Sequence, residues 1–247
     1  MALLTTEKVT KRFGSLVAVD HVDLEVPEGS LTAVIGPNGA GKTTLFNVIT
    51  GLLQADGGRI LLDGKDITGL PSFERVKLGM SRAFQVVSVF KELSVFENMA
   101  IAVQATTPHG RELFTDVRSL EDVNTRSEEI MERMGLIRRK DSLAGHLSHG
   151  EMKVLDIALA LASSPKVILL DEPTSGLSPA ESQEMTQLIK ELASRLTVIL
   201  IEHDMDIVLN IAQSITVLQQ GAVIAKGTPE EIRKNEKVQQ AYLGGMV

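Results

Sequence analysis

One run of eight residues, 36–43, limits what this chain can fold into more than any other feature. Its letters, GPNGAGKT, fit the pattern G-x-x-x-x-G-K-[ST] at every position. An apolar segment, Leu31–Ile35, precedes the run, and a helical pattern over residues 43–49 follows it. Glycines let backbone N–H groups turn toward phosphate oxygens, and a helix start adds unpaired N–H groups. A chance glycine-rich turn would lack these flanks, so we interpret the run as a nucleotide phosphate loop.

The loop and the helix start supply most of the residues that we expect to bind a nucleotide. Lys42 places a cation at the β- and γ-phosphates, and the Thr43 hydroxyl is a candidate Mg²⁺ ligand. The expected phosphate-binding set is Gly36, Pro37, Asn38, Gly39, Ala40, Gly41, Lys42, Thr43 and Thr44.

A second candidate site follows the apolar run at residues 167–170, which ends in Asp171 and Glu172. Carboxylates at the carboxyl end of a parallel strand lie at the ligand-binding edge of such sheets. Asp171 is the expected Mg²⁺ ligand, direct or through water, and Glu172 is the expected group that orients and polarises an attacking water. Alone, this pattern also fits a strand that ends in an acidic turn.

Composition excludes several kinds of function. The net charge of −7 does not suit a nucleic-acid-binding surface, and the absence of cysteine excludes disulfides and thiolate metal sites. The sequence shows no signal peptide and no window near the roughly 18 apolar residues of a membrane span. If the protein serves a membrane process, we expect another chain to cross the membrane.

The order of patterns predicts an α/β fold of one domain over residues 1–247. We expect a core at about 1–91 and 146–227, a helical subdomain at about 92–145 and a helical tail at about 228–247. Residues 16–19 and 22–26 alternate as two strands, Thr197–Ile201 is a buried strand, and residues 215–218 and 222–225 form a hairpin. Ser178, Pro179 and Glu181 mark a helix start.

Further predictions concern the two helical parts. Residues 127–134 form an amphipathic helix and residues 106–110 a loop in the subdomain, whereas residues 154–162 form a core helix. The tail, 229–247, reads as one charged helix that docks through four side chains: Val238, Ala241, Tyr242 and Leu243.

Taken together, these motifs resemble the ATP-binding cassette family of transporter ATPases, over about residues 4–243. Residues 147–151 (LSHGE) resemble the family's signature, and Gln85 lies where the family has its Q-loop glutamine. His203 resembles the switch histidine, Phe13 the aromatic residue that stacks on adenine, and residues 175–178 the D-loop. Each residue alone has a simpler reading, such as a solvated Gln85, a capping His203, a core Phe13 or an N-cap at Ser148.

The resemblance implies a fold and a mechanism. The fold is a P-loop NTPase (RecA-like) core with an antiparallel β subdomain and an inserted helical subdomain. Two cassettes pack head to tail, and ATP with Mg²⁺ lies between the phosphate loop of one and the signature of the other. Lys42, Gln85, Glu172 and His203 are then catalytic, and Ser148, Gly150 and Glu151 contact the ATP bound by a second chain. Thr43, Gln85 and Asp171 are the metal-binding residues.

Departures from the family pattern are few. His149 replaces the usual first glycine of the signature, Glu151 its glutamine, and Ser178 the usual aspartate of the D-loop. No core catalytic position is lost, so the resemblance implies an active ATPase.

The subgroup is suggested by residues 79–85, 89–98, 229–232 and 241–244, which resemble ATPases of branched-chain amino-acid and urea importers. The resemblance then implies transmembrane permease subunits, a solute-binding protein acting indirectly, and a place on the inner face of the cell membrane. Two alternatives remain open: an ATPase of another system, such as lipopolysaccharide export, and a soluble ATPase of the same fold without transport. A P-loop kinase or GTPase would leave the signature, Gln85 and His203 without a role.

Overall fold

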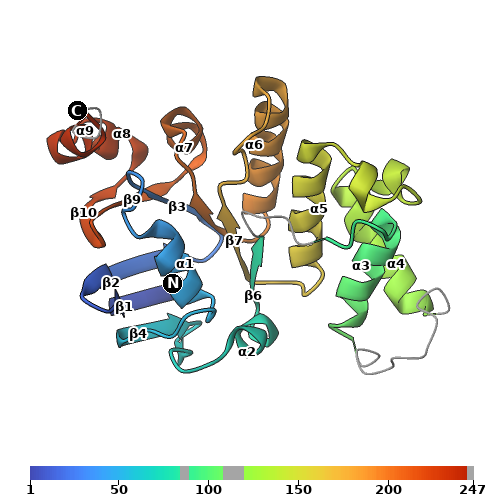
Figure 1. The fold of residues 1–247 in the computed structure, drawn as a ribbon, viewed down its shortest axis with the longest axis horizontal. Coiled ribbons are helices and arrows are strands. Elements are labelled where there is room, and N and C mark those ends of the chain that lie inside the picture. The colour runs from blue at the N-terminus through green and yellow to red at the C-terminus, as the bar shows by residue number, and fades with distance from the viewer. Residues whose placement is uncertain (84–88, 108–119, 244–247) are drawn as a thin grey trace.

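Two sheets with a helix between them organise the fold in this computed structural model, which describes residues 1–83, 89–107 and 120–243 (Figure 1). Among these residues, one sheet has the strand order β10-β9-β3-β8-β7-β6 and the other β2-β1-β4-β5. Strands β9, β3, β8, β7 and β6 pair in parallel, β10 pairs antiparallel with β9, and the smaller sheet is antiparallel. The strands are β1 (Ala2–Phe13), β2 (Leu16–Pro27), β3 (Leu31–Ile35), β4 (Gly57–Leu62), β5 (Lys65–Asp66), β6 (Met80–Ala83), β7 (Val167–Asp171), β8 (Thr197–Ile201), β9 (Ser214–Gln219) and β10 (Ala222–Gly227).

Helices cover both faces of the larger sheet and extend beyond it to one side (Figure 1). Their bounds are α1 (Lys42–Ile49), α2 (Ser72–Lys77), α3 (Val95–Gln104), α4 (Glu121–Arg133), α5 (His149–Leu161), α6 (Pro179–Ala193), α7 (Met205–Ile211), α8 (Pro229–Arg233) and α9 (Glu236–Leu243), with 3₁₀ turns at Ile137–Arg139 and Ala144–His146. This arrangement confirms the predicted α/β class, with an antiparallel sheet and helical elements beside the core.

The short apolar runs of the sequence form the centre of the larger sheet. Every residue of β3, β7 and β8 is buried, as expected for parallel strands covered on both faces. Because parallel strands end at one edge of the sheet, the carboxyl ends of β3 and β7 lie on either side of β8. The phosphate loop follows β3 there, and Asp171 is the last residue of β7.

Helix α1 packs between the two sheets. Leu45 and Phe46 share one buried cluster with Ile60 of the antiparallel sheet and Leu169 of the parallel sheet. The antiparallel sheet therefore covers the helix that follows the phosphate loop, and the last residue of β1, Phe13, comes to lie beside that loop.

Helices α3, α4 and α5 pack together at one end of the molecule (Figure 1). The predicted helix at 127–134 lies mostly within α4, which buries Val123, Ile130 and Met131 against this cluster. The predicted loop at 106–110 is described only for Thr106 and Thr107, which form a turn, and residues 108–110 lie outside the described residues. The division of the chain into core, subdomain and tail remains a prediction.

The prediction of two strands at 16–19 and 22–26 was wrong in one respect, because both belong to the single strand β2. The strand has an irregular register between Val19 and Val22, and His21 there adopts φ 49°. A bulge of this kind breaks the alternation of buried and exposed residues, so one strand resembles two in the sequence.

The prediction of one tail helix was also wrong, because the tail as far as Leu243 forms two short helices, α8 and α9. Asn235 lies between them, and its Oδ1 accepts hydrogen bonds from the backbone N–H of Lys237 (3.0 Å) and of Val238 (3.3 Å). This side chain starts a new helix where the pattern predicted continuation. Val238 and Ala241 are buried and Tyr242 packs against the core, as predicted, whereas the side chain of Leu243 lies outside what the structure describes.

The helix starting at Ser178 is confirmed. Ser178 and Glu181 form a reciprocal capping box with Pro179 in the first turn, and Met185, Ile189 and Leu192 are buried on one face. The helix predicted from residue 154 starts earlier, at His149, because Ser148 and Glu151 form the same kind of box. The hairpin of β9 and β10 is also confirmed.

No helix in the described parts of the chain combines the length and apolar character needed to cross a bilayer.

Candidate functional site

The phosphate loop connects β3 to α1, and two of its glycines have no room for a side chain. Gly36 (φ 153°) and Gly41 (φ 100°) have backbone conformations that favour glycine. A Cβ at Gly36 would lie 2.2 Å from the Leu218 oxygen, and one at Gly41 would lie 2.3 Å from the Ala18 oxygen. The loop therefore keeps its shape only with glycine at both positions.

The start of α1 differs from four other helix starts in this chain. At Gly41 no side chain caps the helix, and the first turn contains no acidic residue. Helices α3, α5, α6 and α8 instead begin with a serine or threonine and a glutamate that bond each other's backbone N–H groups. Without a cap and without a negative charge, the first N–H groups of α1 suit an anion.

Lys42 lies within this loop and is 7 % exposed. Its Nζ donates hydrogen bonds to the carbonyl oxygens of Gly36 (2.7 Å) and Pro37 (3.2 Å). Burial lowers the pKa of Lys42, whereas the negative charges of Glu172 and Asp171 raise it. The ammonium group thus lies inside the loop, facing the two carboxylates of the second predicted site.

A pocket of about 620 Å³ brings several of the predicted residues together, and this volume is in the range of small-molecule sites. Phe13 reaches it from the end of β1 and is 48 % exposed. Glu172 lines the pocket from the end of β7, and Gln220 and Gly221 line it from the β9–β10 turn. The remaining lining residues are Leu16, Val17, Ala18, Asn38, Gly39, Ala40, Gly41, Lys42, Thr43 and Thr44.

Asp171 is 3 % exposed at the end of β7 and forms an ion pair with Arg82 of β6. The Arg82 Nη2 lies 2.5 Å from Asp171 Oδ2, and its Nη1 donates to Asn47 Oδ1 at 2.6 Å. Burial raises the pKa of Asp171, and the Arg82 guanidinium lowers it. No local pattern in the sequence predicts this role of Arg82, because its partner strand β7 is distant along the chain.

The other oxygen of Asp171, Oδ1, is buried and has no hydrogen-bond partner among the described residues. A buried carboxylate oxygen without a donor fits a cation. Mg²⁺ is usually held by one or two carboxylates together with phosphate oxygens, so a cluster of acidic ligands is not required. The described side chains contain no group of three or more His, Cys, Asp or Glu residues placed to bind a metal. Asp171 and Thr43 thus fit a magnesium site that the nucleotide completes.

Glu172 has an unusual backbone, with φ 50°. Its N–H donates to the Ile201 oxygen at 2.9 Å, and its carbonyl accepts from Lys153 Nζ at 3.0 Å. A non-glycine residue in this region is uncommon and is held there by its surroundings. Lys153 is another functional candidate that the sequence analysis missed, because its position on α5 reads as an ordinary helix lysine.

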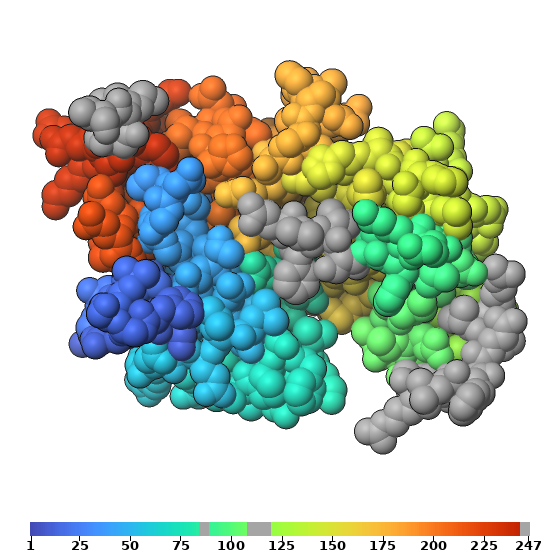
Figure 2. Space-filling view, viewed as in Figure 1, coloured from blue at the N-terminus to red at the C-terminus, as the bar shows by residue number. Residues whose placement is uncertain are grey.

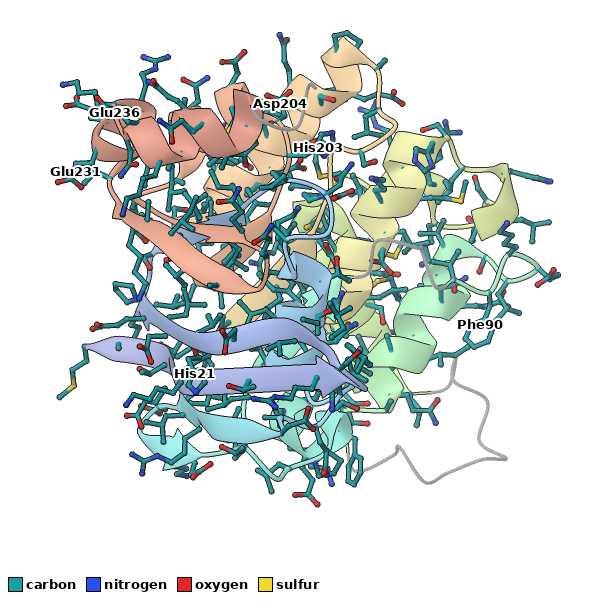
Figure 3. All side chains as sticks on the ribbon, turned by 60° about the vertical axis from the view of Figure 1, so that its left-hand side comes forward. His21, Phe90, His203, Asp204, Glu231 and Glu236 are labelled. Carbon is teal, nitrogen blue, oxygen red and sulfur yellow. The ribbon has the colours of Figure 1, made fainter. Side chains whose placement is uncertain are left out.

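His203 follows β8, and its side chain is 57 % exposed. Its Nδ1 lies 3.7 Å from Glu202 Oε2. Figure 3 shows His203 and Asp204 close together near the top of the view, apart from Phe90 at the lower right. Asp204 caps α7 through hydrogen bonds from the N–H groups of Asp206 and Ile207. His203 does not line the phosphate-loop pocket, and Gln85 lies outside the described residues.

The signature residues Ser148, Gly150 and Glu151 lie apart from the phosphate loop. They line a separate groove of about 670 Å³ between α5 and α6. This groove is slightly larger than the phosphate-loop pocket, and no residue of the loop or of the β7 end lines it. One chain therefore does not bring the signature to its own phosphate loop.

Ser148 also has the simpler role that the sequence allows. Its Oγ accepts from the Glu151 N–H at 3.1 Å, and Glu151 accepts from Ser148 N–H (2.8 Å) and from Arg139 Nε (2.7 Å). His149 points toward the predicted D-loop, because a Cβ added to Gly176 would lie 3.3 Å from its Nε2.

Comparisons with known proteins show the family of this chain. The family described as "ABC transporter" matches residues 19–175, which is more than half of the chain. The family described as "Branched-chain amino acid ATP-binding cassette transporter" matches residues 222–247.

Individual proteins match over almost the full length. The high-affinity branched-chain amino acid transport ATP-binding protein LivG of Salmonella typhimurium is 40 % identical over 251 residues, covering 98 % of both chains. The crystal structure of the ADP conformation of MJ1267, an ATP-binding cassette of an ABC transporter, has a TM-score of 0.89 at 36 % identity and covers 99 % of both chains. The dimeric, post-hydrolysis structure of the ATP-binding cassette MJ0796 with ADP and Pi has a TM-score of 0.77 at 26 % identity, covering 92 % of this chain and 98 % of that one.

Proposed function

This chain belongs to the ABC transporter family of ATP-binding cassettes, and from that premise we propose that it is the ATP-hydrolysing subunit of an importer for branched-chain amino acids. One observation carries the ATPase assignment: the phosphate-loop pocket, with its uncapped helix start, has Glu172 in its wall. The amino-acid assignment is supported by the match of residues 222–247 and by the name of the 40 % identical relative.

In the proposed ATP complex, backbone N–H groups of residues 38–44 bind the phosphates, and Lys42 neutralises the β- and γ-phosphates. Phe13, exposed at the pocket rim, stacks on adenine. Thr43, Asp171 and Gln85 hold Mg²⁺, which neutralises charge on the β- and γ-phosphates when it is bound. The orphaned Oδ1 of Asp171 supports this assignment.

For hydrolysis, we propose that the Glu172 carboxylate orients a water molecule and accepts its proton as the water oxygen attacks the γ-phosphorus. The bond from that phosphorus to the β–γ bridging oxygen breaks, and ADP and phosphate result. In this proposal His203, which does not line the pocket in the free chain, and Gln85 contact the γ-phosphate and the attacking water once ATP is bound.

The complete site needs a second cassette. Ser148, Gly150 and Glu151 lie in a different groove from the phosphate loop, so we propose that they contact the ATP bound by another chain, in a head-to-tail dimer. A structural relative described as a dimer bound to ADP and Pi supports this proposal.

Lys42 gives a first test of the ATP site. Replacing Lys42 by methionine is expected to weaken ATP binding about 10–100-fold, because a charge-assisted hydrogen bond contributes roughly 1.5–3 kcal/mol. Binding is measured with a fluorescent ATP analogue, and Lys190→Met, on the exposed side of α6, is the matched control. Equal affinity of the Lys42 variant and the wild type would contradict the phosphate-loop assignment.

We propose that permease subunits bind at a second groove, of about 380 Å³, between α2 and the α3–α5 pair. Figure 2 shows a notch between the segments that hold α2 (cyan) and α3 (green). Leu52, Phe73 and Val76 line the groove and are 48 %, 59 % and 37 % exposed, which makes an apolar contact surface. The cassette would then lie against the inner face of the membrane through its permease partners.

If permease subunits bind at this groove, Phe73→Asp should weaken their association at least about tenfold. An aromatic side chain that becomes buried on binding contributes much of the binding free energy of such an interface. ATP hydrolysis by the free cassette should change less than about twofold, since Phe73 does not line the phosphate-loop pocket. Leu143→Asp, at a 41 % exposed leucine outside the groove, is the control. Association is measured by co-purification with the permease encoded in the same organism.

The transport assignment is tested by reconstituting the cassette with its co-purifying permease and solute-binding protein in vesicles. ATP-dependent uptake of leucine, isoleucine or valine is the expected result. Three results would contradict this proposal and favour one of the alternatives. They are uptake of urea, outward movement of a lipid, and an active ATPase that purifies without any membrane protein.

A further inference from the structure

The turn after β7 holds Glu172 in a strained backbone conformation. Glu172 is not glycine, yet it has φ 50°, a region that side chains rarely adopt. Because φ of Glu172 fixes the direction of its Cα–Cβ bond, the contacts that hold this turn also aim the carboxylate.

Hydrogen bonds from three directions hold the turn. The Glu172 N–H donates to the Ile201 oxygen (2.9 Å), and the Glu172 carbonyl accepts from Lys153 Nζ (3.0 Å). Two residues later, Thr174 donates from its N–H (2.9 Å) and its Oγ1 (2.6 Å) to Glu202 Oε1. The first and third groups come from β8 and its end, but Lys153 comes from α5, outside the sheet.

Lys153 is nearly buried, with 7 % of its surface exposed, and Glu202 is 0 % exposed. Burial lowers the pKa of Lys153, whereas the charges of Glu202, Glu172 and Asp156 raise it. A residue needed only to fill this space would be apolar, since burying an ammonium group costs free energy unless it is paired and hydrogen-bonded. The buried ammonium group of Lys153 meets this requirement through the acidic groups of Glu202, Glu172 and Asp156 and through its hydrogen bond to the Glu172 carbonyl.

Because Lys153 lies on α5, its contact connects the Glu172 turn with the helix that begins at the signature. Helix α5 begins at Ser148, the signature residue, and Lys153 lies five positions further along. A helix transmits a shift of its first turn to its later turns because its backbone is hydrogen-bonded throughout. The signature of this chain faces another chain's nucleotide in the proposed dimer, while Glu172 acts on the nucleotide of its own phosphate loop.

We propose that Lys153 is a positioning residue that ties the signature helix to the Glu172 turn and so couples the two ATP sites of a dimer. The ammonium group holds the Glu172 carbonyl and keeps the carboxylate aimed at the pocket. Engagement of the signature by the second chain shifts α5, and Lys153 passes this shift to Glu172. The inference rests on the proposed function, because it takes Glu172 as the group that polarises water.

The test uses the full chain with Lys153→Met, which keeps length and packing but removes the donor. We expect kcat for ATP hydrolysis to fall at least about tenfold, since a small misplacement of a reacting group can cost on the order of 100-fold in rate. KM and the affinity for a fluorescent ATP analogue should change less than about twofold, because Lys153 does not line the phosphate-loop pocket. Lys153→Arg, which can still donate to the carbonyl, should restore most of kcat. Lys190→Met is the matched control.

A double variant separates positioning from general damage. In a Glu172→Gln background the carboxylate is already absent, so adding Lys153→Met should lower the residual rate little further. If the two effects multiply, Lys153 acts elsewhere and the inference is wrong. It is also wrong if Lys153→Met hydrolyses ATP like the wild type, or if Lys153→Arg is as slow as Lys153→Met.

A second variant covers the case in which Lys153→Met does not fold, as judged by its melting temperature. Glu202→Gln keeps an acceptor for Thr174 but removes the charge that faces Lys153, and it should lower kcat several-fold with KM unchanged. An unchanged kcat in Glu202→Gln would overturn the inference in that case. The proposed function fails by a different result, an absence of ATP hydrolysis in the wild type, so the two failures are distinguishable.

Discussion

Replacing Glu172 by glutamine is expected to lower the rate of ATP hydrolysis by about 10²–10³-fold while ATP binding remains intact, because general-base help contributes on the order of 10²–10⁴. Glutamine has nearly the same shape, so the φ 50° turn and its bonds to Ile201 and Lys153 persist. What is lost is the negative oxygen that accepts the proton of water. Phosphate release measures the rate, and a fluorescent ATP analogue measures binding.

The Glu172 variant should also accumulate as an ATP-bound dimer, since hydrolysis is the step that loosens the proposed head-to-tail pair. Light scattering with and without ATP and Mg²⁺ measures this. Glu230→Gln, at an exposed glutamate of α8, is the control and should behave as the wild type. Wild-type turnover in the Glu172 variant would mean that another group polarises the water.

Replacing Arg75 by methionine should have the largest effect on stability. Arg75 is 1 % exposed, and its guanidinium donates to four backbone oxygens, those of Val48 (2.8 Å), Ile49 (2.6 Å), Thr68 (2.9 Å) and Leu70 (2.9 Å). Burial lowers the pKa of Arg75 to about 10, so it stays charged at neutral pH. Val48 and Ile49 lie at the end of α1, where the last carbonyl groups lack a partner in a following helical turn, although the Val48 oxygen also accepts from the Gly51 N–H (3.2 Å).

The expected loss in the free energy of unfolding is about 3–4 kcal/mol, because each buried acceptor left without a donor costs roughly 1–3 kcal/mol and removal of the buried charge recovers part of this. The melting temperature should fall by about 10 °C, since 1 kcal/mol corresponds to roughly 2–4 °C in a protein of this size. Arg75→Lys should recover little, because a single ammonium group does not reach four carbonyls. Arg195→Met, at an exposed arginine, is the control, and a similar loss there would contradict the explanation.

The Arg75 variant should also affect the phosphate-loop site. It joins α2, which carries the exposed Phe73 of the permease groove, to the end of α1, whose start forms the phosphate loop. Loss of these hydrogen bonds should therefore weaken ATP binding and also lower the stability of the fold. Thermal melting with and without ATP measures both effects on one sample.

The sequence predicted features that a few neighbouring residues build by themselves. The phosphate loop needs only β3, its glycines and the start of α1, and the capping box at Ser178 needs only Glu181 three residues later. Buried runs such as β7 and β8 are predictable because four successive residues in each strand are apolar, with Asp171 at the end of β7 and Thr197 at the start of β8. Prediction from local patterns fails where one residue interrupts the pattern, as His21 does in β2 and Asn235 does in the tail.

The sequence by itself therefore determined the chemistry that this chain carries, a phosphate loop and two carboxylates after a buried strand, because backbone geometry over some ten residues is enough to specify them. Only the tertiary structure decided which distant groups meet that chemistry. The bond from Arg82 to Asp171 spans 89 positions, that from Arg75 to Val48 spans 27, and that from Lys153 to Glu172 spans 19. Such contacts follow from the order of the strands and the packing of the helices. This arrangement buries charged groups, and a buried charged group needs a partner. No local pattern in the sequence encodes the strand order.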